Sequence, residues 1–153
     1  MKKLLCIMLL AGLLTGCGSD KKTTTVCKGN INEMIAATVT IEATGEKTDV
    51  MKNHIVYDLS NYITEEMPID TYWLEQIKLT NADYESLKGV SAKYNVEGKK
   101  VILDLELDYN KADLDELKKA GLITTDSDKK VVYVSLEQTI KEQEKGGLTC
   151  KEK

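Results

Sequence analysis

The chain has 153 residues, of which 42% are hydrophobic and 30% are charged, and its formal net charge at pH 7 is −4. This is the composition of an ordinary globular protein, and it excludes a collagen, a low-complexity disordered protein and a polytopic membrane protein. The length favours a single domain, because domain sizes cluster around roughly 100–150 residues.

The first residues have the organisation of a secretory signal. Lys2 and Lys3 form a short positive start, and an apolar stretch follows from Leu4 to Leu14. This stretch is shorter than the roughly 20 residues that span a bilayer, so it is typical of a signal peptide. We therefore expect residues 1–16 to be removed during export.

The signal ends in Leu14-Thr15-Gly16-Cys17, which resembles the lipobox of bacterial lipoproteins. The resemblance implies that a dedicated peptidase cuts before Cys17 and that the Cys17 sulfur carries a diacyl group. Cysteine suits this chemistry because its thiolate is a strong nucleophile. The implied location is the extracytoplasmic side of a cell membrane, with the lipid bilayer as a partner. The alternative is a secreted chain in which Cys17 is an ordinary small residue.

The charge of the mature chain argues against nucleic acid as a partner. All 21 cationic residues are Lys, and two of them leave with the signal. The remaining 137 residues (153 less 16) contain 19 Lys and 25 acidic residues, a net charge of −6. Phosphate neutralisation and base readout favour clustered Lys and Arg, so the sequence predicts no nucleic-acid binding.

Cys27 and Cys150 are the two further cysteines of the mature chain. Outside the cytoplasm an even pair predicts a disulfide, with two free thiols as the alternative. There is no Cys-x-x-Cys motif, which disfavours a redox catalyst. The polar stretch Gly18–Val26 has no periodic pattern. We therefore expect the lipidated cysteine and a flexible tether over residues 17–26, and a single domain over residues 27–153.

Alternating apolar residues predict two β-hairpins. In the first, Ile35–Ala43 and Met51–Leu59 lie on either side of a turn at Gly45-Glu46-Lys47. In the second, Val90–Glu97 and Lys100–Tyr109 flank Gly98-Lys99.

Three helices are predicted from apolar spacing and end signals. The first starts at Pro68-Ile69-Asp70 and ends at Gly89. Its apolar face is Trp73, Ile77, Thr80, Tyr84 and Leu87. Asn110 is expected to cap a second helix through Lys119, which stops at Gly121. Asp126–Lys129 turns the chain into a strand at Val131–Val134. The capping box Ser135–Gln138 then opens a last helix, which Gly146-Gly147 closes.

The expected order is therefore β-β-α-β-β-α-β-α. Most of these strands have one polar face, so one side of the sheet is expected to contact water. The economical packing is an α+β fold, an antiparallel or mixed sheet with helices on one face.

Three short runs form a recognisable pattern: the strand-to-helix run Leu107–Leu114, the residues Lys88-Gly89-Val90 and the start of the last helix, Val134–Glu137. This pattern resembles that of the YehR-like small bacterial lipoproteins. The resemblance covers most of the chain from about Ile35. It implies a single α+β lipoprotein domain in a family whose molecular function is not established. The chain departs from the pattern in Cys27 and Cys150, and in the acidic, tyrosine-bearing segment Ser60–Tyr72.

Asp104, Glu106 and Asp108 place three carboxylates on one strand face. They are candidates for cation binding, but Ca²⁺ takes six to eight oxygen ligands and a strand face seldom supplies them. A solvated face that prevents sheet-to-sheet association explains them better.

The other polar candidates also have structural explanations. Asp113, Asp115 and Glu116 fall in the first turns of a helix, where negative charge is stabilised. The spacing of Asp126 and Asp128 is similar to the start of a calcium-binding loop, but the further ligand residues of such a loop do not follow. His54 is the single imidazole and lies on a polar strand face. No nucleophile elbow and no phosphate-binding glycine loop is present. The sequence therefore predicts no catalytic residues, no metal and no cofactor.

The aromatic residues have two interpretations. Trp73 and Tyr84 are expected in the core. Four tyrosines have no assigned place, and a cluster of them in a groove between helix and sheet is typical of a binding site. These are Tyr57, Tyr62, Tyr72 and Tyr94.

Three functions remain open from the sequence. The first is a non-catalytic, membrane-anchored envelope lipoprotein that binds an envelope protein or a small ligand. The second is an envelope enzyme or cation-binding protein that uses the acidic strand face. The third is a structural spacer.

Overall fold

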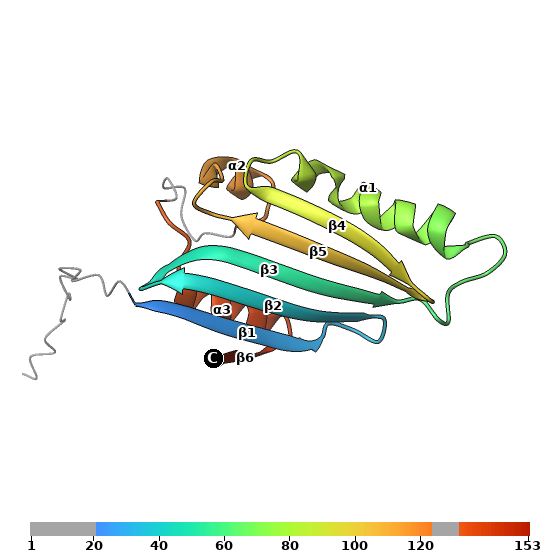
Figure 1. Ribbon diagram of the computed structural model, residues 1–153, viewed down its shortest axis with the longest axis horizontal. Helices are drawn as coiled ribbons and strands as arrows, with labels where there is room; N and C mark the ends of the chain where they lie inside the picture. Colours follow the sequence, from blue (N-terminus) through green and yellow to red (C-terminus); the bar gives the residue numbers. More distant parts are fainter. Residues whose placement is uncertain (1–20, 124–131) are drawn as a thin grey trace, which may run out of the picture.

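The computed structural model describes residues 21–123 and 132–153, and a six-stranded antiparallel sheet is its centre (Figure 1). The spatial order of the strands is β4-β5-β3-β2-β1-β6. The strands are β1 (Lys22–Asn30), β2 (Ile35–Thr44), β3 (Lys47–Asp58), β4 (Val90–Glu97), β5 (Lys100–Asp108) and β6 (Thr149–Glu152).

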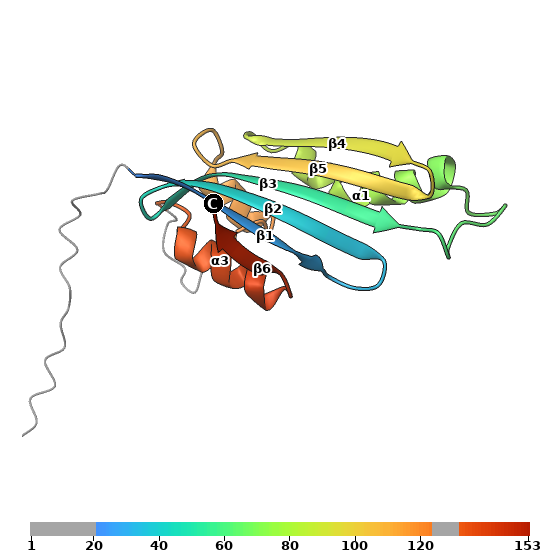
Figure 2. The same cartoon turned by 60° about the horizontal axis from the view of Figure 1, so that its bottom comes forward.

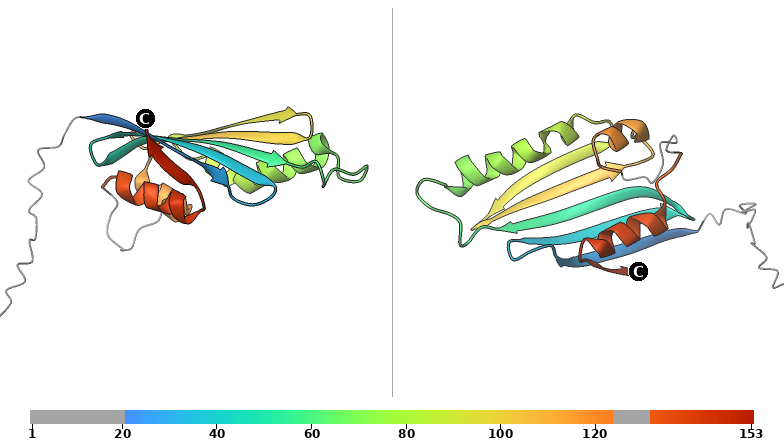
Figure 3. Two further views of the ribbon diagram at one scale, coloured as in Figure 1. Left: turned by 90° about the horizontal axis from the view of Figure 1, so that it is seen from below. Right: turned by 180° about the vertical axis from the view of Figure 1, so that it is seen from behind.

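The helical elements all lie on one face of this sheet (Figures 2 and 3). They are the π-helical turn η1 (Ile69–Trp73) and the helices α1 (Leu74–Glu85), α2 (Leu114–Lys119) and α3 (Leu136–Lys145). Helix α1 runs along the β4 and β5 side, and α3 crosses the β1 and β2 side. Within residues 21–123 and 132–153 the other face of the sheet carries no helix. The antiparallel sheet and its separate helices confirm the expected α+β class.

The alternation of β5 builds the core. Its helix-facing side chains are buried, whereas Asp104 and Glu106 on the opposite face are exposed. The buried set is Val101, Leu103, Leu105, Leu107 and Tyr109. Each fully buried aliphatic side chain contributes about 1.5–3 kcal/mol, so this strand anchors the packing of the helices.

Both predicted hairpins form. β2 pairs with β3 from Ile35 opposite Tyr57 to Thr44 opposite Lys47. β4 pairs with β5 from Val90 opposite Leu107 to Glu97 opposite Lys100. Because β3 also pairs with β5, the two hairpins join into one continuous sheet.

Part of the segment that we expected to be a flexible tether is a strand. Residues 22–26 form the first half of β1, paired with β2 from Lys22 opposite Thr44. Three consecutive Thr residues favour extended backbone, and the edge of β2 supplies hydrogen-bond partners for it. The lipobox and residues 17–20 lie outside the described residues.

The first predicted helix begins and ends differently. Residues 69–73 form a π-helical turn before α1, and the helix stops at Glu85 with Ser86 as its C-cap, before Gly89. Ile77 is the single buried residue of α1, and Thr80 of the expected apolar face is exposed. The second helix is capped by Asp113, not Asn110, because Asp113 accepts hydrogen bonds from the amides of Asp115 and Glu116.

The order of elements at the C-terminal end also needs correction. Of the strand expected at Val131–Val134, residues 132–134 have no strand pairing, and Val131 lies outside the described residues. Ser135 instead makes an isolated bridge with Lys47 and caps α3 through the amide of Gln138. The unexpected strand β6 follows α3 and pairs with the edge of β1. The observed order is β-β-β-α-β-β-α-α-β, with η1 leading into the first helix.

Among residues 21–123 and 132–153, none of the helices has the length and apolarity needed to cross a bilayer.

Candidate functional site

The three carboxylates of the acidic strand face each have a basic side chain as a neighbour. Asp104 lies 2.7 Å from Nδ1 of His54 on β3. Asp108 lies 2.6 Å from the Lys111 ammonium, which lowers the pKa of that carboxyl. Glu106 is directly opposite Lys52 in the ladder, and its charge helps to raise the pKa of Lys52, which chiefly bonds to Glu42. This arrangement of alternating charge stabilises an exposed sheet face.

No group of three metal-ligating side chains is assembled anywhere in the described part of the chain. Asp113, Asp115 and Glu116 lie together at the start of α2, where Asp113 bonds to backbone amides. Asp126 and Asp128 lie outside the described residues.

Cys27 and Cys150 are joined by a disulfide. They are directly opposite each other in the β1–β6 ladder, and Cys27 is completely buried. The bond therefore links the C-terminal strand to the first strand of the domain.

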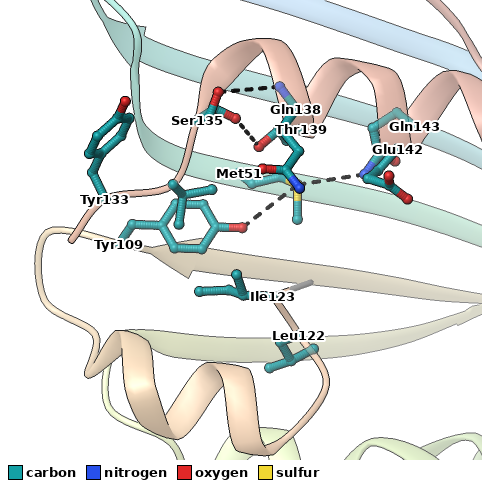
Figure 4. Close-up of a pocket in the computed structure, with 11 residues that line it drawn as sticks. Met51, Tyr109, Leu122, Ile123, Tyr133, Ser135, Gln138, Thr139, Glu142 and Gln143 are labelled. Atoms are coloured by element: carbon teal, nitrogen blue, oxygen red, sulfur yellow. Dashed lines mark hydrogen bonds between the residues drawn. The ribbon is translucent and has the colours of Figure 1, made fainter. Parts of the chain in front are cut away.

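A small cavity lies between the sheet and α3, where segments distant in the sequence meet (Figure 4). Met51 of β3 and Tyr109 after β5 form its floor, and Gln143 of α3 reaches toward Met51 from the other side. The Tyr109 hydroxyl and the Gln143 amide nitrogen each lie 4.0 Å from the Met51 sulfur. Burial raises the pKa of Tyr109 to about 12.

The volume of this cavity limits what it holds. It is about 100 Å³, whereas sites for drug-sized ligands are roughly 300–1,000 Å³. Such a space admits a few water molecules or a very small solute, so it is a poor candidate for a ligand site.

A second hollow lies beside the N-terminal half of α1, and we call it the distal groove. It is about 190 Å³, and its wall is mostly apolar. It is lined by Met34, Tyr57, Leu59, Trp73, Gln76, Ile77 and Thr80. These residues come from the β1–β2 loop, β3 and its following loop, η1 and α1. The groove therefore opens at the end of the sheet where β3 ends and α1 begins.

Aromatic rings gather beside the distal groove. The rings of Tyr62 and Tyr72 both make edge-to-face contacts with Trp73, with centroids 6.1 Å and 5.4 Å apart. The Trp73 indole N–H donates to the Tyr62 carbonyl at 3.3 Å, which orients the ring. Tyr62 and Tyr72 remain 44% and 38% exposed. We call these three residues the aromatic cluster.

The sequence interpretations of the aromatic residues are therefore partly right. Tyr57 lines the groove, and Tyr62 and Tyr72 lie next to it. Tyr94 instead donates a hydrogen bond to Glu85 at 2.6 Å, and burial together with this bond raises the pKa of Tyr94. Trp73, which we expected in the core, is half-buried and shared between the core and the groove.

Some groove residues were missed by sequence reasoning. Met34 lies in a loop and Gln76 on an exposed helix face, and neither has a local pattern that points to a site. The one usable signal was the acidic, tyrosine-bearing segment Ser60–Tyr72, which precedes Trp73 directly.

The chain matches a family model over residues 36–149, and that model is described as "Protein of unknown function (DUF1307)". No curated protein sequence matches the chain significantly.

Two solved structures resemble this fold. The NMR structure of the Escherichia coli YehR protein superposes with a TM-score of 0.61 at 16% identity, covering 86% of this chain and 91% of that one. The NMR structure of a protein from Streptococcus pneumoniae TIGR4 gives a TM-score of 0.50 at 13% identity, covering 89% and 88%. At these identities the likeness concerns the fold alone.

Proposed function

This chain belongs to the DUF1307, YehR-like family of proteins of unknown function, and we propose that it is a membrane-anchored lipoprotein of a bacterial envelope with a non-catalytic binding domain. The observation that carries the proposal is the ordered set of positive start, apolar stretch and Leu14-Thr15-Gly16-Cys17. A diacylated Cys17 is the anchor, and the envelope is the compartment.

On this proposal the folded domain lies close to its anchor. β1 begins at Lys22, so four residues separate it from Cys17. Four residues extend to at most about 14 Å. The domain is thus held near the bilayer, with the end of the sheet that carries the start of β1 nearest to the lipid.

The aromatic cluster lies at the other end of the sheet. β3 has 12 residues and runs from the hairpin beside the start of β1 to the loop that precedes the cluster (Figure 1). At about 3.3 Å per residue this separates the two ends by roughly 40 Å. The anchor therefore displays the distal groove to other envelope molecules, which supports a binding role.

The test of the anchor is incorporation of radiolabelled palmitate into the full-length chain expressed in a bacterial host. We expect Cys17→Ala to lose the label and the membrane association. Cys6→Ala, which changes the other cysteine of the N-terminal segment, serves as the matched control and keeps both. Label retained by Cys17→Ala contradicts the anchor.

In-cell cross-linking of the same full-length chain separates a binding domain from a spacer. A binding domain gives a discrete adduct that needs the membrane location, so Cys17→Ala diminishes it. If the wild-type chain gives no adduct and no ligand stabilises it, the spacer interpretation replaces the proposal.

A further inference from the structure

We propose that the distal groove and its surroundings form the docking site for a cationic, amphipathic segment of an envelope protein. This inference rests on the proposed function, because it names the partner of the domain that the lipid anchor would display. Three observations carry it: an open apolar groove, exposed aromatic rings at its edge, and an uncompensated acidic charge around it.

The groove supplies the apolar half of the site. Leu59 and Ile77 form a buried base, and Met34, Tyr57 and Trp73 pack against it from three separate segments. A volume of about 190 Å³ admits one or two aliphatic side chains of a partner. Exposed apolar surface bordered by polar residues is typical of a docking site.

The chain around the groove supplies the charged half. Residues 53–77 contain no Lys, and they contain the carboxylates Asp58, Glu65, Glu66, Asp70 and Glu75. Asp58 pairs with Lys100 at 3.3 Å, and Glu75 pairs with Lys78 at 3.0 Å.

The other three carboxylates keep their charge exposed. Glu65 and Glu66 are exposed in the loop before η1, and Asp70 is exposed in η1 itself. Within the described chain no ion pair involves these three carboxylates. The β4–β5 hairpin brings one cation, Lys99, beside this loop, because the Lys99 carbonyl accepts a hydrogen bond from the Leu59 amide. Since this single Lys is outnumbered by the three carboxylates, the surface is acidic overall. This acidic surface is complementary to a cationic partner.

The aromatic cluster links the two halves. A Lys or Arg side chain that approaches a carboxylate near Tyr62 or Tyr72 also meets the face of an aromatic ring, whose negative quadrupole attracts a cation. An apolar groove, flanked by aromatic rings and carboxylates, fits a helix with one apolar and one basic face.

The position of the site favours a protein over a lipid surface. The site is at the end of the sheet opposite the start of β1, and anionic headgroups are repelled by Glu65, Glu66 and Asp70. The sheet's open face is a poorer candidate, because Lys52 there pairs with Glu42 and Asp104 already contacts His54.

Trp73 is the single Trp of the chain, so intrinsic fluorescence reports on the groove itself. The experiment adds a synthetic Leu–Lys amphipathic peptide without aromatic residues to the full chain in detergent. We expect a saturable change in Trp73 fluorescence. A Leu–Glu peptide of the same pattern and a Lys-only peptide should produce a change at least tenfold weaker.

Two charge variants with the same change in net charge then locate the site. Glu65→Gln/Glu66→Gln/Asp70→Asn should weaken binding about tenfold or more. Glu42→Gln/Asp104→Asn/Glu106→Gln, which removes three carboxylates from the open face, should leave it within about twofold. Gln76→Lys, an exposed change at the groove wall, should weaken binding as strongly as the first variant.

Several outcomes overturn the proposal while leaving the palmitate test untouched. Equal weakening by both triple variants means non-specific attraction to net charge. A Trp73 response to peptidoglycan fragments, without a response to the Leu–Lys peptide, makes the groove a glycan site. A Trp73 signal that depends on protein concentration alone makes it a contact between copies of this chain.

Discussion

Gly89 accepts a hydrogen bond from the Asp108 amide at 2.7 Å, and it does so at a point where the two backbones leave no room for a side chain. A Cβ on Gly89 would lie 2.7 Å from the Asp108 carbonyl oxygen and 2.8 Å from the Ala112 nitrogen. Gly89 also has φ +81°, in the left-handed region that favours glycine. The contact closes the start of β4 against the end of β5.

Gly89→Ala should therefore destabilise the fold by about 2–4 kcal/mol, the sum of left-handed strain and backbone displacement. Gly98→Ala is the matched control, because Gly98 has φ +60° but nothing within 4 Å of an added Cβ. That variant should lose about 1–2 kcal/mol. Denaturant unfolding of both variants checks the difference, and equal losses would show that the Asp108 contact is unimportant.

Loss of the Cys27–Cys150 bond should lower the free energy of unfolding by about 2–4 kcal/mol, because the bond closes a long loop in the unfolded chain. Cys27→Ala/Cys150→Ala and the wild type in reductant are compared by thermal unfolding. We also expect amide protection to fall first in β6, which has four residues and pairs only with β1. An unchanged melting temperature after complete reduction contradicts this prediction.

Asp113→Ala should cost about 0.5–2 kcal/mol, because two amides at the start of α2 lose their acceptor. Asp113→Asn keeps the acceptor and should cost much less. Asn110→Ala removes exposed side-chain hydrogen bonds with Lys47 and Asp49 and should change stability by less than about 0.5 kcal/mol. If Asn110→Ala loses more stability than Asp113→Ala, then Asn110 is the helix cap, as we expected from the sequence.

Tyr109 should make the fold sensitive to alkaline pH. Its folded pKa is about 12, against an ordinary value of about 10, so above pH 10 the unfolded chain loses this proton first. Stability from this group is complete below about pH 10 and falls by about 2–3 kcal/mol as the pH rises to 12. Urea unfolding of wild type and Tyr109→Phe across this range checks it. The unfolding free energy of the wild type minus that of Tyr109→Phe should fall by that amount between pH 10 and 12. If this difference does not change with pH, the prediction is wrong.

Local sequence patterns were sufficient to predict the parts of the fold that depend on neighbours along the chain. The alternation from Val101 to Tyr109 was sufficient for β5 because side chains on a strand point to opposite faces with a period of two. The Ser135 cap could also be predicted locally, because its hydroxyl accepts a hydrogen bond from an amide only three residues away. Cys27 and Cys150 were paired correctly, because they were the two remaining cysteines of the predicted mature domain.

The elements that need a distant partner could not be predicted locally, because tertiary packing supplies that partner. Residues 22–26 and 149–152 have little apolar alternation, and they are strands because the edges of β2 and β1 accept their hydrogen bonds. The distal groove has the same origin, since Met34, Tyr57 and Trp73 meet only when the β1–β2 loop, β3 and η1 are brought to one end of the sheet. A site assembled from separate segments has no characteristic residue spacing that could be recognised in the sequence, because its geometry is set by how the sheet and helix pack.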